Sequence, residues 1–122
     1  MVRKDSTELT DADREQLVEA MRTSDASRVV VTHGTDTLIE TARYVARSGA
    51  AAHKAVAFVG ATKPERLKDS DASFNLGVAV GVTAVLPLGS VVIAMGGRII
   101  DCMAAERDMQ TGLFARTPST AR

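Results

Sequence analysis

Apolar positions in the first third of the chain switch from a helical period to a strand period. Leu17, Val18 and Met21 recur at helical spacing. Before them, Thr10–Asp13 offers a threonine N-cap and acidic residues for a first helical turn. The β-branched run Arg28–Val31 follows. We expect a helix and then a strand that is buried on both faces, as strands of parallel sheets are.

A second helix and a second strand come next. Residues 38–48 carry apolar side chains on one side, and Gly49 stands where a left-handed C-cap is expected. Thr37 and Glu40 have the spacing of a capping box that starts such a helix. The apolar run 55–59 predicts another buried strand, and the polar residues after it predict a loop.

An uncharged stretch from residue 72 to residue 97 is long enough to be considered as a membrane span. Polar residues and recurrent glycines interrupt it, and a Pro-Leu-Gly-Ser segment at 87–90 divides it. We therefore expect a buried helix at 74–86, a turn, and a strand at 91–95. Gly96 and Gly97 then favour a tight hairpin turn into a further strand.

The order of these elements predicts an α/β fold with an open, mostly parallel sheet, helices on both faces and a C-terminal antiparallel hairpin. Residues 103–110 predict a final helix, and 117–122 a flexible tail. At 122 residues the chain is long enough for one core. We expect one domain at 1–116, followed by that tail.

Composition narrows the function classes. Fifteen basic and fifteen acidic residues cancel, and aromatic residues are few, so we expect no nucleic-acid partner. Cys102 is the only cysteine, which excludes an internal disulfide, fits a reducing, cytoplasmic compartment and predicts a small buried residue. The first residues lack the apolar stretch of a secretory signal. No motif with metal-ligand or phosphate-binding spacing occurs, so we expect no cofactor.

The segment 32–37 gathers reactive side chains at the carboxyl end of the first predicted strand. Ligands bind at this edge of parallel sheets, where helix N-termini also favour anions. Gly34 permits a sharp turn, Thr35 offers a hydroxyl, and Asp36 offers a carboxylate that can meet an ammonium or orient a proton carrier. The plain alternative is that Thr35, Asp36 or Thr37 only caps the following helix.

The sequence Val-Val-Thr-His-Gly-Thr-Asp-Thr-Leu-Ile-Glu-Thr-Ala at 30–42 resembles the second active-site signature of the L-asparaginase family of amidohydrolases. Three more segments are similar to that family: 5–10 to its substrate-binding serine segment, 59–77 to its next strand, loop and helix start, and 87–98 to its following hairpin. The likeness covers 5–114 and is nearest to short members without a C-terminal domain. It implies the three-layer fold of an asparaginase N-terminal domain.

Members of this family hydrolyse the side-chain amide of asparagine by attack of a threonine, through an acyl-enzyme and with release of ammonia. The resemblance implies that Thr35 and Asp36 help to activate the nucleophile, and that Asp36 also holds the substrate's α-amino group. An ungapped alignment puts Arg107 where the family has its catalytic lysine. The residues implied for substrate binding are Ser6, Gly34, Thr35, Asp36 and the backbone of Ala61.

The chain departs from the family pattern at two places. It has no Thr-Gly-Gly-Thr segment, which carries the family's nucleophile, and the family's first strand is missing with it, so we expect an exposed sheet edge that invites a partner chain or aggregation. The second departure is Arg107, because a guanidinium stays charged above about pH 12 and cannot act as a base. Arg107 either pairs with Asp36 or lies solvated beside Glu106 and Asp108.

The remaining ionisable residues have simpler interpretations. His33 is expected to be structural, and His53 to be exposed in a loop. Lys63 and Lys68 are alternative replacements for the missing lysine.

The sequence therefore predicts an asparaginase-family amidohydrolase domain that is weak or inactive as this chain. One alternative is a non-catalytic homologue that binds an amino acid through Ser6, Thr35 and Asp36 or acts by assembly, and another is a truncated gene product. The expected partners are a small amide or amino acid, such as asparagine or aspartate, and further copies of the chain, since family sites are completed by a neighbouring subunit. No membrane partner is expected.

Overall fold

The computed structural model describes residues 9–60 and 71–117. The elements along them are α1 (Asp11–Thr23), β1 (Arg28–Thr32), α2 (Leu38–Ser48), β2 (Ala55–Val59), α3 (Ala72–Thr83), β3 (Val91–Met95), β4 (Arg98–Asp101), β5 (Ala105–Arg107) and β6 (Phe114–Arg116). The first four strands form one sheet in the order β1-β2-β3-β4, and the last two form a separate hairpin. The expected division into a domain and a tail stays a prediction, because residues 118–122 lie outside the described part.

The sheet is mostly parallel, as predicted. β1 and β3 both pair parallel with β2, and β4 returns antiparallel along β3. The turn between β3 and β4 passes through Gly96 and Gly97, whose φ angles of 60° and 77° lie in the left-handed region that glycine adopts without strain. The two glycines therefore make the hairpin turn that their sequence predicts.

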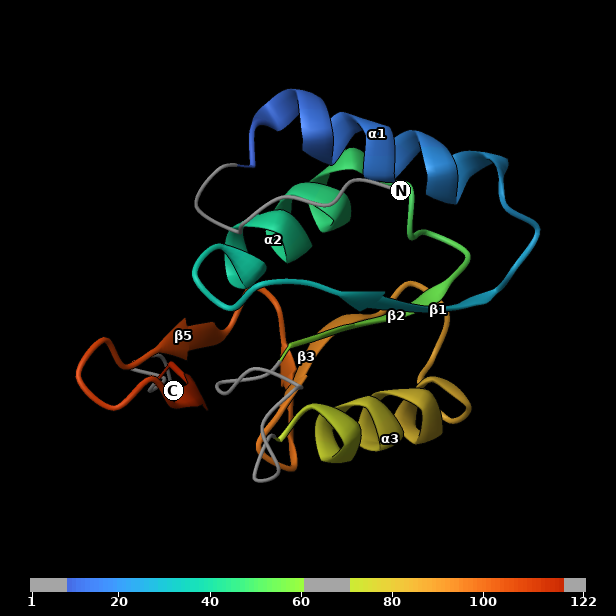
Figure 1. Cartoon of the computed structure of the whole chain (residues 1–122). Helices are drawn as coiled ribbons and strands as arrows, with labels where there is room; N and C mark the ends of the chain where they lie inside the picture. The colour runs from blue at the N-terminus through green and yellow to red at the C-terminus, as the bar shows by residue number, and fades with distance from the viewer. Residues whose placement is uncertain (1–8, 61–70, 118–122) are drawn as a thin grey trace, which may run out of the picture.

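Helices cover both faces of this sheet. α1 and α2 lie together on one face, and α3 lies on the other (Figure 1). β1, β2 and β3 follow one another across the sheet in a single direction. The crossovers through α2 and through α3 therefore have opposite hands, so one of them departs from the right-handed rule for parallel connections. The predicted three layers are confirmed. With this strand order, the two helices can cover opposite faces only if the two crossovers differ in hand.

The core is centred on β2 and β3, all of whose residues are buried. Leu38, Ala42 and Val45 of α2 pack against them. β1 differs: its three valines are only half-buried, so the expectation that both of its faces are buried is wrong. The reason is its position, because within the described residues β1 is the outermost strand and has β2 on one side only. The expected open edge lies here.

The predicted helix at 103–110 is also wrong, because Ala105–Arg107 forms β5 and pairs antiparallel with β6. Arg43 of α2 is one cause. Its Nε donates to the carbonyl oxygen of Cys102 (2.9 Å) and its Nη2 donates to that of Ala105 (2.9 Å), so these carbonyls are used outside any helix. Tertiary contacts thus override the helix propensity of Met, Ala, Glu and Arg.

Two of the capping residues that the sequence predicts end their helices as expected, and one predicted cap does not form. Thr10 and Asp13 form a reciprocal capping box at the start of α1, and Gly49 ends α2 at φ 81°. The expected box at the start of α2 is absent, since the Thr37 side chain makes no capping hydrogen bond. Glu40 lies 3.6 Å from Arg14 Nη2 instead, which joins α2 to α1.

The uncharged residues 72–97 form α3, a turn, β3 and the start of the hairpin, as expected. Within the described part of the chain, no helix has both the length and the apolar composition needed to cross a bilayer.

Candidate functional site

The segment between β1 and α2 lies at the carboxyl end of the parallel strands. The His33 N–H donates to the Val59 carbonyl oxygen (2.9 Å) and so continues the β1–β2 pairing beyond Thr32. Gly60 packs tightly against this segment. A Cβ at position 60 would lie 2.5 Å from the His33 carbonyl oxygen and 3.2 Å from the Thr35 methyl carbon. Only glycine fits there, so the ends of β1 and β2 meet at the candidate site.

Asp36 forms an ion pair with a residue far along the chain. Its Oδ1 lies 3.0 Å from Nη1 of Arg107 at the end of β5. The Arg107 side chain is 19% exposed and that of Asp36 is 52% exposed, so the pair lies at the rim of the fold. The guanidinium also lies over the Phe114 ring, 5.6 Å from its centre, which is a cation–π contact. The expectation that Arg107 pairs with Asp36 is confirmed, and the solvated alternative is wrong.

The β5–β6 hairpin holds Arg107 in place. Arg107 lies opposite Phe114 in the hairpin, and Asp108 closes the turn by accepting from the N–H groups of Gln110 (2.8 Å) and Thr111 (3.2 Å). These two hydrogen bonds lower the pKa of the Asp108 carboxyl. Nε of Arg107 is buried and has no hydrogen-bond partner within residues 9–60 and 71–117. Arg107 therefore has donor capacity beyond its pair with Asp36.

The His33 ring is packed beside this segment in its neutral form. Its Nδ1 lies 2.6 Å from the Gly34 carbonyl oxygen, so Nδ1 carries the proton and donates. Desolvation by burial lowers the pKa of His33, and this effect outweighs the Gly34 hydrogen bond, which acts in the opposite direction. The ring lies tilted toward Phe58, with the two ring centres 6.4 Å apart. Among the described residues, no three His, Cys, Asp or Glu side chains gather as metal ligands do.

Asn75 joins two strand ends to α3, a role that the sequence pattern did not predict. Its Nδ2 donates to the Gly60 carbonyl oxygen (2.9 Å) and to Oδ2 of Asp71 (3.0 Å), and its Oδ1 accepts from the Gly96 N–H (3.0 Å). The side chain is fully buried. The available signal was a single amide in an otherwise apolar helix, because buried polar groups are nearly always hydrogen-bonded. Asn75 thus holds the end of β2 beside the candidate site.

The other expected residues divide into those that the structure describes and those that it does not. Gly34 and Thr35 lie next to Asp36 in the β1–α2 segment, and His53 is exposed, as expected. Cys102 is buried as expected, and burial raises the pKa of its thiol to about 11. The candidate residues that lie outside the described part, so that their roles stay predictions, are Ser6, Ala61, Lys63 and Lys68.

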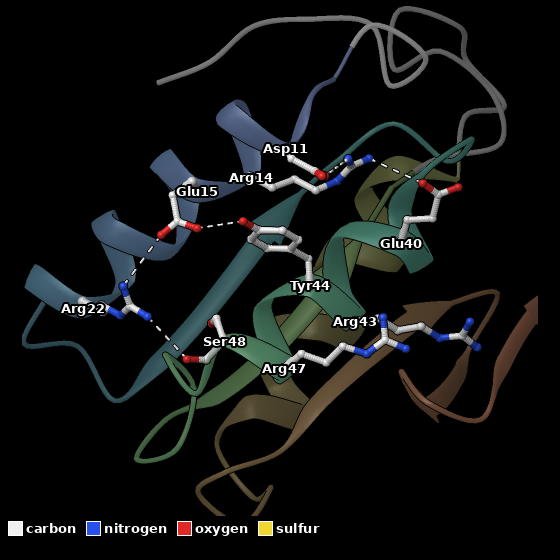
Figure 2. Close-up of a pocket in the computed structure, with 9 residues that line it drawn as sticks. All are labelled: Asp11, Arg14, Glu15, Arg22, Glu40, Arg43, Tyr44, Arg47 and Ser48. Atoms are coloured by element: carbon white, nitrogen blue, oxygen red, sulfur yellow. Dashed lines mark hydrogen bonds and ion pairs between the residues drawn. The ribbon is translucent and has the colours of Figure 1, made fainter.

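A groove of about 630 Å³ lies on the outer side of α1 and α2 (Figure 2). Its charged side chains are largely paired: Tyr44 Oη donates to Glu15 (2.7 Å), which raises the pKa of Tyr44, and Arg22 Nη1 lies 3.7 Å from Glu15. Neither Asp36 nor Arg107 lines it. The groove is lined by Asp11, Arg14, Glu15, Arg22, Glu40, Arg43, Tyr44, Arg47 and Ser48. Across the groove, the Arg14–Glu40 ion pair and the Tyr44–Glu15 hydrogen bond join the two helices. The groove does not contain the candidate site.

Known proteins resemble the chain over nearly its whole length. The sequence matches the family described as "Asparaginase, N-terminal" over residues 1–115. It is 37% identical over 101 residues to a glutamyl-tRNA(Gln) amidotransferase subunit from Thermofilum pendens, covering 83% of this chain and 22% of that protein. The corresponding amidotransferase subunit from Pyrobaculum aerophilum is 38% identical over 81 residues, 66% of this chain and 19% of its own length. The chain thus spans only a small part of these relatives.

Solved structures have the same fold. L-asparaginase I from Vibrio cholerae superposes with a TM-score of 0.79 at 24% identity, over 93% of this chain and 35% of that one. A probable cytoplasmic L-asparaginase from Campylobacter jejuni superposes with a TM-score of 0.78 at 22% identity, over 94% of this chain and 37% of that one. These likenesses show that the chain has the same fold as the matching parts of those proteins.

Proposed function

Because this chain belongs to the asparaginase family, we propose that it carries one half of an amide-hydrolysing site. In that half, Thr35 and Asp36 help a threonine nucleophile to lose its proton, and Asp36 holds the amino group of asparagine. The observation that supports this proposal is their position. Both residues stand at the carboxyl end of the parallel strands, in the segment against which Gly60 packs.

We further propose that the chain by itself hydrolyses asparagine slowly or not at all. Its sequence has no Thr-Gly-Gly-Thr segment to provide the nucleophile, whose loss removes most of an enzyme's rate. Beside Asp36 stands the guanidinium of Arg107, and a guanidinium does not act as a base toward a hydroxyl. The nucleophile and the group that accepts its proton must therefore come from residues other than 32–37 and 107.

Release of ammonia from asparagine and from glutamine tests this proposal. We expect no release above the blank from the chain, and none from its Thr35→Ala and Asp36→Ala variants. A full-length L-asparaginase such as that from Vibrio cholerae provides the positive control. Release by the chain at a rate near that of the control, abolished in both variants, would falsify the proposal.

A second candidate function is amino-acid binding without hydrolysis, and the Asp36–Arg107 pair favours it. A carboxylate complements an α-ammonium group, and a guanidinium complements an α-carboxylate through two parallel hydrogen bonds. An amino acid that separates the two side chains would satisfy both of them. Arg107 also has a buried Nε without a partner among the described residues, and a ligand carboxylate can use it.

Calorimetry with aspartate and with asparagine at millimolar concentration tests the binding function. We expect heat from the chain, and its loss in Asp36→Asn and in Arg107→Met. Arg116→Met is the matched control, because Arg116 is an exposed arginine of the same hairpin and should leave binding unchanged. Absence of heat from the chain itself counts against a binding role.

The names of the two curated relatives suggest a context for either function. Both are named as a subunit of a glutamyl-tRNA(Gln) amidotransferase, and the chain covers 22% and 19% of them. We propose that the amide comes from glutamine or asparagine, that the chain works in an assembly, and that its location is cytoplasmic. The lone, buried Cys102 and the name of the Campylobacter structure support that location.

A further inference from the structure

The pairing of β2 with β3 changes at the carboxyl end of β2. Along the strands, backbone groups make this pairing, as the Val56 N–H does with the Ser90 carbonyl oxygen (2.9 Å). In a regular parallel ladder every second residue repeats such bonds, so the N–H and C=O of Gly60 would face the Ala94 carbonyl and the Gly96 N–H. Side chains take the place of both of these bonds.

The Asn75 amide lies between the two strand ends. Its Nδ2 donates to the Gly60 carbonyl oxygen (2.9 Å) and its Oδ1 accepts from the Gly96 N–H (3.0 Å). These two backbone groups would bond to each other in a continued ladder, so the amide is inserted between them. The Met95 Sδ accepts from the Gly60 N–H (3.3 Å) and lies 3.5 Å from Asn75 Nδ2. Both polar backbone groups of Gly60 are thus held by buried side chains of α3 and β3.

The position of Gly60 decides how Thr35 is supported. A Cβ at position 60 would lie 3.2 Å from the Thr35 methyl carbon, so this methyl group rests against the Gly60 backbone. The methyl and the hydroxyl of a threonine are attached to the same Cβ, so a contact that fixes one of them also fixes the direction of the other. A shift of Gly60 toward β3 would take this support away from Thr35.

We propose that Met95 and Asn75 are positioning residues, which hold Gly60 away from β3 and against the β1–α2 segment so that the Thr35 hydroxyl keeps one direction. A hydroxyl that assists a nucleophile has to be held in this way, because small displacements of such groups cost much of their effect. The role of Thr35 itself rests on the proposed function. Met95 suits its place because its carbon atoms fill the core while its sulfur offers a weak acceptor.

Nuclear magnetic resonance of the full chain tests the proposal through Met95→Leu, which conserves the side-chain volume and removes the acceptor. Three-bond couplings should show one χ1 rotamer of Thr35 in the parent chain and an average over rotamers in the variant. Exchange of the Gly60 N–H with solvent should become about tenfold faster or more, whereas exchange of the Phe58 N–H inside β2 should change less. A general loss of stability would speed both amides by the same factor.

Met21→Leu is the matched control, because Met21 is a second buried methionine that belongs to α1 and packs in the same core. It should leave the Thr35 rotamer and the Gly60 exchange unchanged. A Met95→Leu variant that behaves like this control overturns the proposal. A parent chain in which Thr35 already averages over rotamers overturns it as well, and that result requires no variant to fold. Neither readout depends on amide hydrolysis or on amino-acid binding, so failure of the proposed function and failure of this proposal are separate results.

Discussion

The two faces of the sheet are covered by helices of opposite character. α2 is amphipathic, and toward α1 its outer side carries charged and hydrogen-bonded side chains such as Glu40 and Tyr44 (Figure 2). α3 has no charged residue and is apolar on its outer side as well. The difference teaches that burial against the sheet is not what distinguishes the two helices. The outer sides of the helices distinguish them. The charged outer side of α2 indicates contact with water, and the apolar outer side of α3 indicates an apolar neighbour.

On each face a buried polar side chain also ties a helix to another element. On the α3 face this is Asn75, which is fully buried and bonded to two strand ends. On the other face it is Arg14 of α1, whose Nε donates to Thr41 Oγ1 of α2 (2.9 Å). The Arg14 side chain is 10% exposed, so part of its solvation is kept. We expect the two anchors to differ in their contribution to stability for this reason.

The largest effect is expected from Asn75→Leu. The change leaves the Gly60 carbonyl and the Gly96 N–H without their partner in a buried place, which should lower the free energy of unfolding by about 2 to 4 kcal/mol. Urea unfolding followed by circular dichroism measures it. Ser73→Ala, on the exposed side of the same helix, is the control and should stay within about 0.5 kcal/mol. An equally stable Asn75→Leu variant would show that α3 needs no polar anchor.

A smaller loss is expected from Arg14→Met. The substitution keeps much of the side-chain volume but removes the donor to Thr41, at a cost of about 1 to 2 kcal/mol in the same unfolding experiment. Asp11 and Glu40 are mostly exposed and are solvated once the arginine is gone. Arg22→Met is the control, because the half-exposed Arg22 should contribute less than about 0.5 kcal/mol. If Arg14→Met costs more than Asn75→Leu, the ranking of the two faces is reversed.

The smallest effect concerns pH and depends on His33, which follows the carboxyl end of β1. The unfolded chain binds a proton at the ordinary His33 pKa of 6.5, whereas burial lowers the pKa of His33 in the folded chain. Its contribution to stability is therefore complete above pH 6.5 and is lost as the pH falls from there toward the folded pKa. Thermal unfolding midpoints between pH 7.5 and pH 5 should fall in the parent chain.

Two histidine variants isolate that effect. His33→Asn should remove much of the decrease, because asparagine does not titrate in this range. His53→Asn should keep it, since His53 is exposed. A His33→Asn variant with the full decrease assigns the pH dependence to other groups.

Prediction from the sequence succeeded where one local pattern decides the structure. α2, β2 and β3 have the predicted boundaries, because an apolar period, a glycine C-cap or a continuous apolar run defines each of them. Long-range contacts decided the failures. Pairing with β6 and the Arg43 hydrogen bonds made a strand of a segment with helical composition. The exposure of β1 depends on its place at the sheet edge, which a run of valines does not reveal.

The candidate site was predictable in part for a similar reason. Asp36 and Arg107 are far apart in the sequence, and only the family resemblance brought them together before the structure showed their ion pair. The role of Asn75 depends on three backbone or side-chain groups from different segments, and no spacing rule connects them. Gly60 likewise looks like an ordinary loop glycine until its contact with the His33 carbonyl is known.

The opposite hands of the two crossovers bear on how such a fold can arise. A fold that grows by duplication of one strand-helix-strand unit repeats the hand of that unit. Here the unit β1-α2-β2 and the unit β2-α3-β3 are related as mirror-image paths over opposite faces, so neither can be superposed on the other (Figure 1). Duplication of one strand-helix-strand unit therefore does not account for both crossovers. In a chimaera that exchanges the sequences of α2 and α3, each sheet face would be covered by the helix whose outer side matches the opposite face.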